Sequence, residues 1–138
     1  MPAKMVLLDT HGLIALLNTA DTLHARAREL WRSLGQAGYA VILTDWIIAE
    51  TGNGLARTKA RRQFAAMIRS LGTSKRVETI FVDEDLLKRS LDFYEKRRDK
   101  NWGLVDCASF AIMKDRAISE AFTNDKHFKQ AGFQCLLI

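Results

Sequence analysis

The stretch Met5-Val6-Leu7-Leu8-Asp9-Thr10 decides the fold of this chain. Its four consecutive apolar residues predict a short strand, and the pattern that follows predicts a helix from about residue 11. Asp9 therefore lies just past the carboxyl end of a strand. In open α/β sheets, ligands bind at that edge. We interpret Asp9 as a candidate functional carboxylate.

Working outward, short apolar runs alternate with helical patterns along the chain. We predict strands at 5–8, 40–43, 79–82, 118–122 and 134–138, and helices at about 11–18, 23–35, 45–56, 58–71, 84–98, 104–114 and 126–131. This alternation predicts an α/β fold with a mostly parallel five-stranded sheet and helices on both faces. The two consecutive helices between Asp45 and Leu71 predict an inserted helical hairpin. No repeat or linker is visible, so residues 1–138 are expected to form a single domain.

Three more carboxylates occupy similar places. Asp125 follows the predicted strand that ends near Phe122, whereas Glu50 and Asp106 fall on predicted helices that can lean over the same edge. Four clustered acids attract a hard divalent cation. The sequence thus predicts a metal site built from Asp9, Glu50, Asp106 and Asp125.

Each acid also has a purely structural interpretation. Asp9 and Asp125 fit helix caps or turns, and Asp106 fits a favourable charge in the first turn of a helix capped by Gly103. Glu50 follows the apolar residues 46–49, where burial of an unpaired carboxylate is costly. Solvent exposure at one corner of the helix is its alternative.

The charge balance favours a polyanionic partner. The chain has 21 Lys and Arg against 16 Asp and Glu, which is +5 overall, and setting the four acids aside leaves 21 minus 12, or +9. A basic body around an acidic pocket suits nucleic-acid cleavage. A well-solvated basic protein is the simpler interpretation of the same charge.

Several classes of protein are disfavoured. The longest apolar runs have four or five residues, far short of the roughly 20 that cross a bilayer. The start Met-Pro-Ala-Lys leads straight into a strand without a leader pattern, so we expect a cytoplasmic protein with no membrane association. Cys107 and Cys135 lack the spacing of a zinc site or a disulfide framework, and we expect both to be reduced.

Four short segments together resemble the PIN-domain nucleases, particularly the VapC-type toxins of prokaryotic toxin–antitoxin pairs. They are Val6-Leu7-Leu8-Asp9-Thr10, Thr44-x-x-Ile47-x-x-Glu50-Thr51, Leu104-Val105-Asp106-Cys107-Ala108-Ser109-Phe110 and Thr123-Asn124-Asp125-Lys126-His127-Phe128. The likeness continues through Gly132-Phe133 and so spans nearly the whole chain. It implies a PIN-like three-layer α/β/α fold.

The resemblance also implies a function. Asp9, Glu50, Asp106 and Asp125 match the acidic quartet that binds Mg²⁺ or Mn²⁺ and performs catalysis. Thr10 and Thr123 match polar neighbours that orient ligands or water. A homodimer, an antitoxin partner and RNA as substrate are implied as well. The chain departs from the family at position 11, where His replaces a small polar residue such as Ser or Asn, and at Gly103, where many relatives carry Ser.

Other side chains near the quartet allow two interpretations each. His11 and His127 lie two residues beyond key aspartates and fit either acid–base groups or structural roles. The basic residues around the second hairpin helix fit RNA contacts or a solvated face, and Trp46 fits base stacking or the core. The candidate RNA contacts are Arg57, Lys59, Arg61, Arg62 and Trp46.

The four acids favour a metal-dependent nuclease, and the resemblance implies that it is an endoribonuclease that acts as a toxin. Two alternatives remain open. One is a PIN-like RNA-binding module without turnover. The other is an aspartate-based phosphatase or phosphoacceptor domain, although a phosphatase requires a second Asp at position 11, where this chain has His.

Overall fold

The structure is a computed structural model that describes residues 4–138. The expectation that the chain starts without a leader pattern rests partly on residues 1–3, which lie outside the described residues. The elements in chain order are β1 (Met5–Leu8), α1 (Thr10–Leu17), α2 (His24–Gln36), β2 (Ala40–Thr44), α3 (Asp45–Leu55), α4 (Arg61–Leu71), β3 (Val77–Ile80), α5 (Glu84–Lys96), α6 (Leu104–Asp115), β4 (Glu120–Phe122), α7 (Lys126–Gln130) and β5 (Gln134–Cys135).

The five strands form one sheet in the order β3-β2-β1-β4-β5, and every pairing is parallel. β1 lies in the centre, where Leu7 pairs with Ile42 on one side and with Ala121 on the other. Residues 6–8 are 0% exposed. The uninterrupted apolar run of β1 follows from this burial, since helices cover both faces of a parallel sheet.

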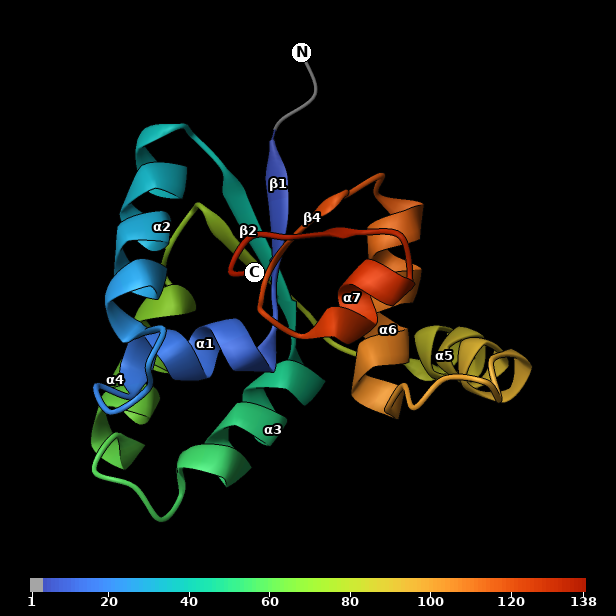
Figure 1. Ribbon diagram of the computed structural model, residues 1–138, viewed down its shortest axis with the longest axis horizontal. Coiled ribbons are helices and arrows are strands. Elements are labelled where there is room, and N and C mark those ends of the chain that lie inside the picture. Colours follow the sequence, from blue (N-terminus) through green and yellow to red (C-terminus); the bar gives the residue numbers. More distant parts are fainter. Residues whose placement is uncertain (1–3) are drawn as a thin grey trace.

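The helices form two outer layers (Figure 1). Helices α1 to α4 lie on one side of the sheet, and α5 to α7 lie on the other. The predicted three-layer α/β/α architecture is confirmed. The predicted hairpin is the pair α3 and α4, which connects β2 to β3. Among residues 4–138, no helix combines the length and the apolar character that crossing a membrane requires.

Three strand predictions differ from the observed bounds by two residues or more. β4 begins at Glu120 rather than at 118, β3 is shifted, and β5 is shorter than predicted. β3 covers 77–80 rather than 79–82, because the chain leaves the sheet where the Val82 N–H donates to Asp45 Oδ1 at 2.8 Å. Phe81, predicted inside that strand, is 72% exposed. β5 is only two residues long, yet the N–H groups of Leu136 and Leu137 still donate to backbone carbonyls of Ala121 and Thr123.

Helix boundaries differ by a few residues, and most differences have a local cause. α4 begins at Arg61 rather than 58, because Thr58 forms a turn with the carbonyl of Leu55. Gly35, expected at a helix end, lies inside α2. The chain instead reverses at Gly38, whose φ of +78° suits a residue without a side chain.

Gly12 sets the distance between α1 and the sheet. A Cβ atom at this position would lie 2.1 Å from the carbonyl oxygen of Phe122 at the end of β4. Only glycine therefore lets the first turn of α1 lie directly against β4. This close packing brings the residues at the end of β1 next to those that follow β4.

Candidate metal centre

The order in which strands are added to the sheet reverses between β1 and β4, although all strands remain parallel. From β1 the connections run to β2 and then β3 on one side, and β4 and β5 lie on the other. Such a switch point opens a crevice beyond the carboxyl ends of the two strands. Asp9 and Asp125 follow these strands, and the Asp9 N–H donates to the Phe122 carbonyl at 3.4 Å. The fold thus brings two distant acids to one crevice.

Asp9 is only 1% exposed and is held by several donors. Its Oδ2 accepts a hydrogen bond from Thr123 Oγ1 at 2.8 Å and from the His11 N–H at 3.4 Å. The second bond makes Asp9 the N-cap of α1. The cap and the functional interpretation are therefore compatible, because capping orients the carboxylate into the crevice.

Asp125 has the same double role. It is the N-cap of α7, where its Oδ1 accepts from the His127 N–H at 3.0 Å. Its own N–H donates to Thr123 Oγ1 at 3.0 Å. The Thr123 hydroxyl therefore connects Asp9 to Asp125 and fixes their relative position.

Asp106 reaches the crevice from the opposite layer. It is the third residue of α6, and its Oδ2 accepts from the N–H of the cap residue Gly103 at 3.3 Å. Burial raises the pKa of Asp106 to about 6, and the negative charges of Asp9 and Asp125 contribute to the same rise. A carboxylate destabilised by burial and by like charges is stabilised by a cation.

Glu50 is arranged differently. It lies on α3 and is exposed. Of the two alternatives, a buried carboxylate that needs a cation and an exposed one, the structure shows the second. Its Oε1 accepts a hydrogen bond from Thr10 Oγ1 at 2.7 Å. Thr10 follows Asp9 directly, so Glu50 lies at the open side of the crevice.

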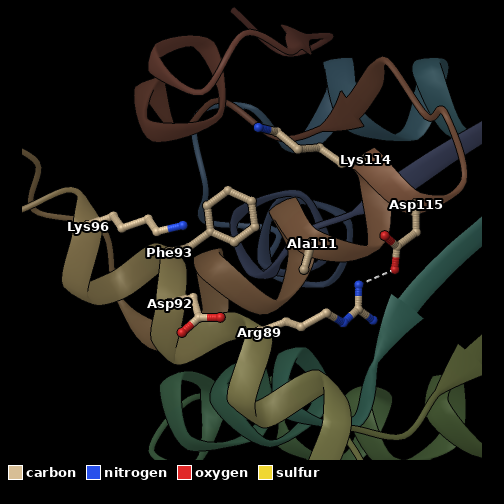
Figure 2. Close-up of a pocket in the computed structure, with 7 residues that line it drawn as sticks. All are labelled: Arg89, Asp92, Phe93, Lys96, Ala111, Lys114 and Asp115. Atoms are coloured by element: carbon tan, nitrogen blue, oxygen red, sulfur yellow. Dashed lines mark hydrogen bonds and ion pairs between the residues drawn. The ribbon is translucent and has the colours of Figure 1, made fainter.

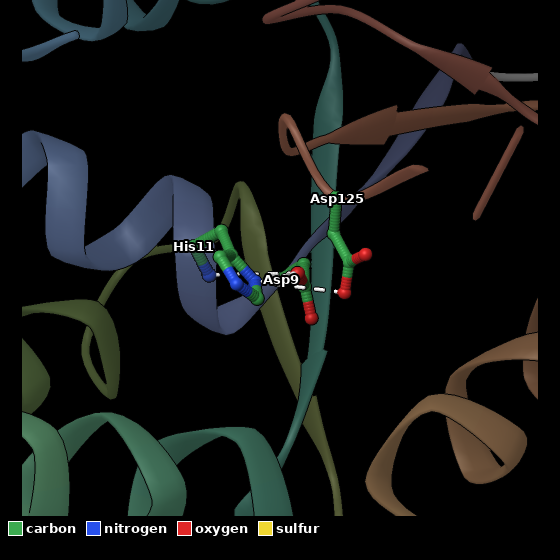
Figure 3. A group of neighbouring side chains, drawn as sticks. All are labelled: Asp9, His11 and Asp125. Carbon is green, nitrogen blue, oxygen red and sulfur yellow. Dashed lines mark hydrogen bonds and ion pairs between the residues drawn. The ribbon is translucent and has the colours of Figure 1, made fainter. Parts of the chain in front are cut away.

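Both histidines lie among the acids. His11 Nδ1 is 3.1 Å from Asp9 Oδ2 and 3.7 Å from Asp125 Oδ2 (Figure 3). The hydrogen bond with Asp9, reinforced by the surrounding acids, raises the pKa of His11 to about 9. His127 Nδ1 lies 3.2 Å from Asp106 Oδ2 and 3.4 Å from Asp125 Oδ1. Each imidazole therefore sits between two carboxylates.

The ligand-type atoms form two groups that share Asp125. Asp9, His11 and Asp125 form one group, and Asp106, Asp125 and His127 form the other, with the atoms of each group within 4.8 Å of one another. Among residues 4–138, the hydrogen bonds to Asp9 and Asp106 all end on Oδ2. Each Oδ1 is left for another partner. This oxygen-rich donor set fits a hard divalent cation.

The candidate RNA contacts lie outside both groups. Arg57, Lys59, Arg61 and Arg62 are exposed around the turn between α3 and α4. Lys59 lines a cavity of about 370 Å³ between this turn and the end of α1. Trp46 is half-buried in the first turn of α3, one turn before Glu50.

Another cavity, of about 300 Å³, lies between α5 and α6 (Figure 2). It contains none of the four acids. Its lining carries both charges, and Figure 2 shows Arg89 reaching across it to Asp115. We therefore locate the candidate site by the convergence of carboxylates at the switch point and not by these two cavities.

Sequence reasoning did not identify Gly12 as part of this architecture. Its close contact with β4 holds α1, and hence Asp9 and His11, against the residues after β4. A glycine in the first turn of an otherwise apolar helix was the available signal, because glycine weakens a helix unless another backbone comes close.

The fold and the site have counterparts among known proteins. The family model described as PIN domain matches residues 6–134. The 23S rRNA-specific endonuclease VapC20 of Mycobacterium tuberculosis is 33% identical over 131 residues, which cover 94% of this chain and 95% of that protein. Its crystal structure, that of a sarcin–ricin loop cleaving toxin, matches with a TM-score of 0.82 at 27% identity, covering 93% of this chain and 95% of that one.

A second solved structure shares the fold alone. It is VapBC2 from Rickettsia felis bound to a DNA fragment from its promoter, with a TM-score of 0.67 at 14% identity, covering 95% of this chain and 96% of that chain. The family model covers nearly the whole chain, and the similarity to VapC20 is equally extensive. This chain therefore belongs to the PIN domain family.

Proposed function

We propose that this protein is a divalent-metal-dependent endoribonuclease and the toxin of a toxin–antitoxin pair, acting in the cytoplasm as one PIN-like domain of residues 1–138. The observation that carries the proposal is the convergence of Asp9, Asp106 and Asp125 at the switch point of the sheet. The similarity to VapC20 supports RNA as the substrate class.

The three converging aspartates, with Glu50, hold Mg²⁺ or Mn²⁺ in this proposal. The Oδ1 atoms of Asp9 and Asp106 are free of the hydrogen bonds that occupy Oδ2, and Asp125 contributes to both groups. When bound, the ion neutralises charge on the scissile phosphate and lowers the pKa of a water. Glu50, exposed and held by Thr10, completes the pocket from its open side through water.

Two threonines position these acids. Thr123 donates to Asp9 and accepts from the N–H of Asp125, and Thr10 donates to Glu50. Because partners of metal ligands fix the orientation of the donor atoms, loss of either hydroxyl is expected to weaken metal binding.

The basic surface delivers the substrate. The exposed cations around the turn between α3 and α4 attract the RNA backbone, and Trp46 stacks a base beside Glu50. The residues are Arg57, Lys59, Arg61, Arg62 and Trp46. Trp46 lies on α3 together with Glu50. Arg61 and Arg62 lie on α4, and Arg57 and Lys59 lie in the turn between the two helices. This neighbourhood supports a contact with RNA on the Glu50 side of the crevice.

Two partners complete the proposal. An antitoxin protein blocks the site in the resting cell, and a second copy of the chain forms a homodimer. Membership of the family supports both. Growth arrest on expression of this chain alone, relieved by the product of a small neighbouring gene, is the expected result for a toxin.

The decisive experiment is a cleavage assay with RNA that includes a sarcin–ricin-loop hairpin. The wild-type chain is expected to cleave in the presence of Mg²⁺ or Mn²⁺ and not in EDTA, whereas Asp106→Ala is expected to be inactive. Equal activity of the two proteins would contradict the proposal. RNA binding without cleavage by either protein would instead favour a binding module.

The same two proteins separate metal binding from turnover. Mn²⁺ is expected to raise the melting temperature of the wild type and to have a smaller effect on Asp106→Ala, because binding to the folded state stabilises it. Covalent phosphorylation of Asp9 by a small phosphodonor, without RNA cleavage, would favour the phosphoacceptor alternative.

A further inference from the structure

A cationic cavity lies next to the acid crevice, where α5 ends and the chain turns toward α6. Its volume is about 530 Å³. The lining residues that matter are Tyr94, Arg97, Arg98, Lys100, Trp102 and Gly103. Apart from Gly103, these residues have no role in the proposed metal centre.

Gly103 connects this cavity to the metal centre. It lines the cavity, and its backbone N–H donates to Asp106 Oδ2 at 3.3 Å. A Cβ at position 103 would meet no atom within 4 Å, so the cavity is open at this end. A chain molecule lying in the cavity can therefore continue past Gly103 to the acids.

Several contacts hold the wall of the cavity. Trp102 is 7% exposed, its Nε1 donates to Gln130 Oε1 at 3.1 Å, and its ring packs edge-on against Phe110 at 4.9 Å. The guanidinium of Arg97 lies 5.0 Å from the centre of the Trp102 ring. These contacts preorganise the wall, which reduces the entropy lost when a ligand binds.

The lip of the cavity carries excess positive charge. Asp99 contacts both Arg97 at 3.1 Å and Lys100 at 3.7 Å, so one anion faces two cations. Arg98 is exposed and forms no ion pair among residues 4–138. By contrast, the α5–α6 cavity of Figure 2 pairs its Arg89 with Asp115. Tyr94, 54% exposed, adds an aromatic face to the cationic lip.

We infer that this cavity binds the single-stranded RNA segment that flanks the scissile phosphate. Arg98 and Lys100 contact phosphates, and Tyr94 stacks a base. Cations that follow the backbone beside an aromatic face are the combination that single-stranded nucleic acids require. The inference rests on the proposed ribonuclease function and adds a subsite distinct from the cations of α4 and of the turn between α3 and α4.

The test compares Arg98→Ala with Arg28→Ala. Arg28 is also exposed and lies on α2, across the sheet from α5 (Figure 1). Binding is measured by fluorescence anisotropy with a labelled single-stranded RNA about 12 nucleotides long, in the full chain carrying Asp106→Asn to prevent cleavage. Arg98→Ala is expected to raise the Kd about tenfold. It is also expected to reduce the salt slope of log K by about 0.7, the value for one phosphate contact.

Variants of Tyr94 test the same subsite independently of Arg98. Tyr94→Ala is expected to weaken binding about tenfold, whereas Tyr94→Phe keeps the wild-type Kd because stacking needs only the ring. If Arg98→Ala and Arg28→Ala share one Kd and one salt slope, the subsite is overturned. That outcome leaves the ribonuclease proposal intact. The ribonuclease proposal fails instead if the chain with its native Asp106 does not cleave RNA, or if Asp106→Ala cleaves it equally well.

Discussion

The two sides of the acid crevice are built differently. On the β1–β4 side, Asp9 is almost fully buried and shares the Thr123 hydroxyl with Asp125, which also lies close to Asp106. On the α3 side, Glu50 is exposed, and its side chain has a single hydrogen-bond partner in the described part of the chain, Thr10. Strong metal binding requires the first arrangement, because buried like charges gain most from a cation.

The four acids come from four matching sequence segments, but they are not four equivalent metal ligands. Asp125 belongs to both groups of ligand-type atoms, whereas Glu50 belongs to neither. We expect the buried side to determine metal affinity. We expect the exposed side to position a water molecule and to affect how the substrate approaches.

The largest expected effect separates these two sides directly. Asp125→Asn is expected to lower kcat/KM for RNA cleavage by about 1,000-fold, because it removes a charge shared by both groups. Glu50→Gln is expected to lower it by about tenfold. Asn caps helices as well as Asp does, so the melting temperature of Asp125→Asn without metal should not fall. Equal losses in the two variants would show that Glu50 is an equivalent ligand.

A smaller effect tests the packing of the buried side. Gly12→Ala is expected to destabilise the fold by about 3 kcal/mol, which is about 10 °C in melting temperature, because its Cβ would overlap the Phe122 carbonyl. Gly54→Ala, on α3, is the control. Its Cβ would meet only Ile14 Cδ1 at 3.4 Å, and alanine suits a helix better by up to about 1 kcal/mol. A fully stable Gly12→Ala protein would contradict the close contact.

The smallest effect concerns pH. The pKa of His11 in the folded protein is about 9, above its ordinary value of 6.5. Its contribution to stability is therefore fully present below pH 6.5 and is lost as the pH rises through about 9. In EDTA, the melting temperature of the wild type is expected to exceed that of His11→Asn at pH 6 and to approach it above pH 9. Parallel curves for the two proteins would exclude this charge effect.

The order of strands and helices followed from local patterns. Apolar runs and helical periodicity predicted most elements, because these signals act within a few residues. The structure adds local caps, such as Thr44 for α3 and Asp83 for α5. β3 was misplaced by two residues, because a contact from Asp45, 37 positions away, decides where the strand ends. The resemblance named the four acids, but it did not rank them.

The sequence by itself determined the alternation of strands and helices, the place of Asp9 and Asp125 after two strands, and the basic character of the body. Only the tertiary structure decided that Asp106 and His127 meet across 21 residues, that Glu50 remains exposed, and that the loop after α5 opens a cationic cavity beside Gly103. The physical reason is the distance along the chain over which each interaction acts. Caps and strands depend on neighbours in the chain, whereas burial, ion pairing and cavities depend on which faces the whole fold packs together.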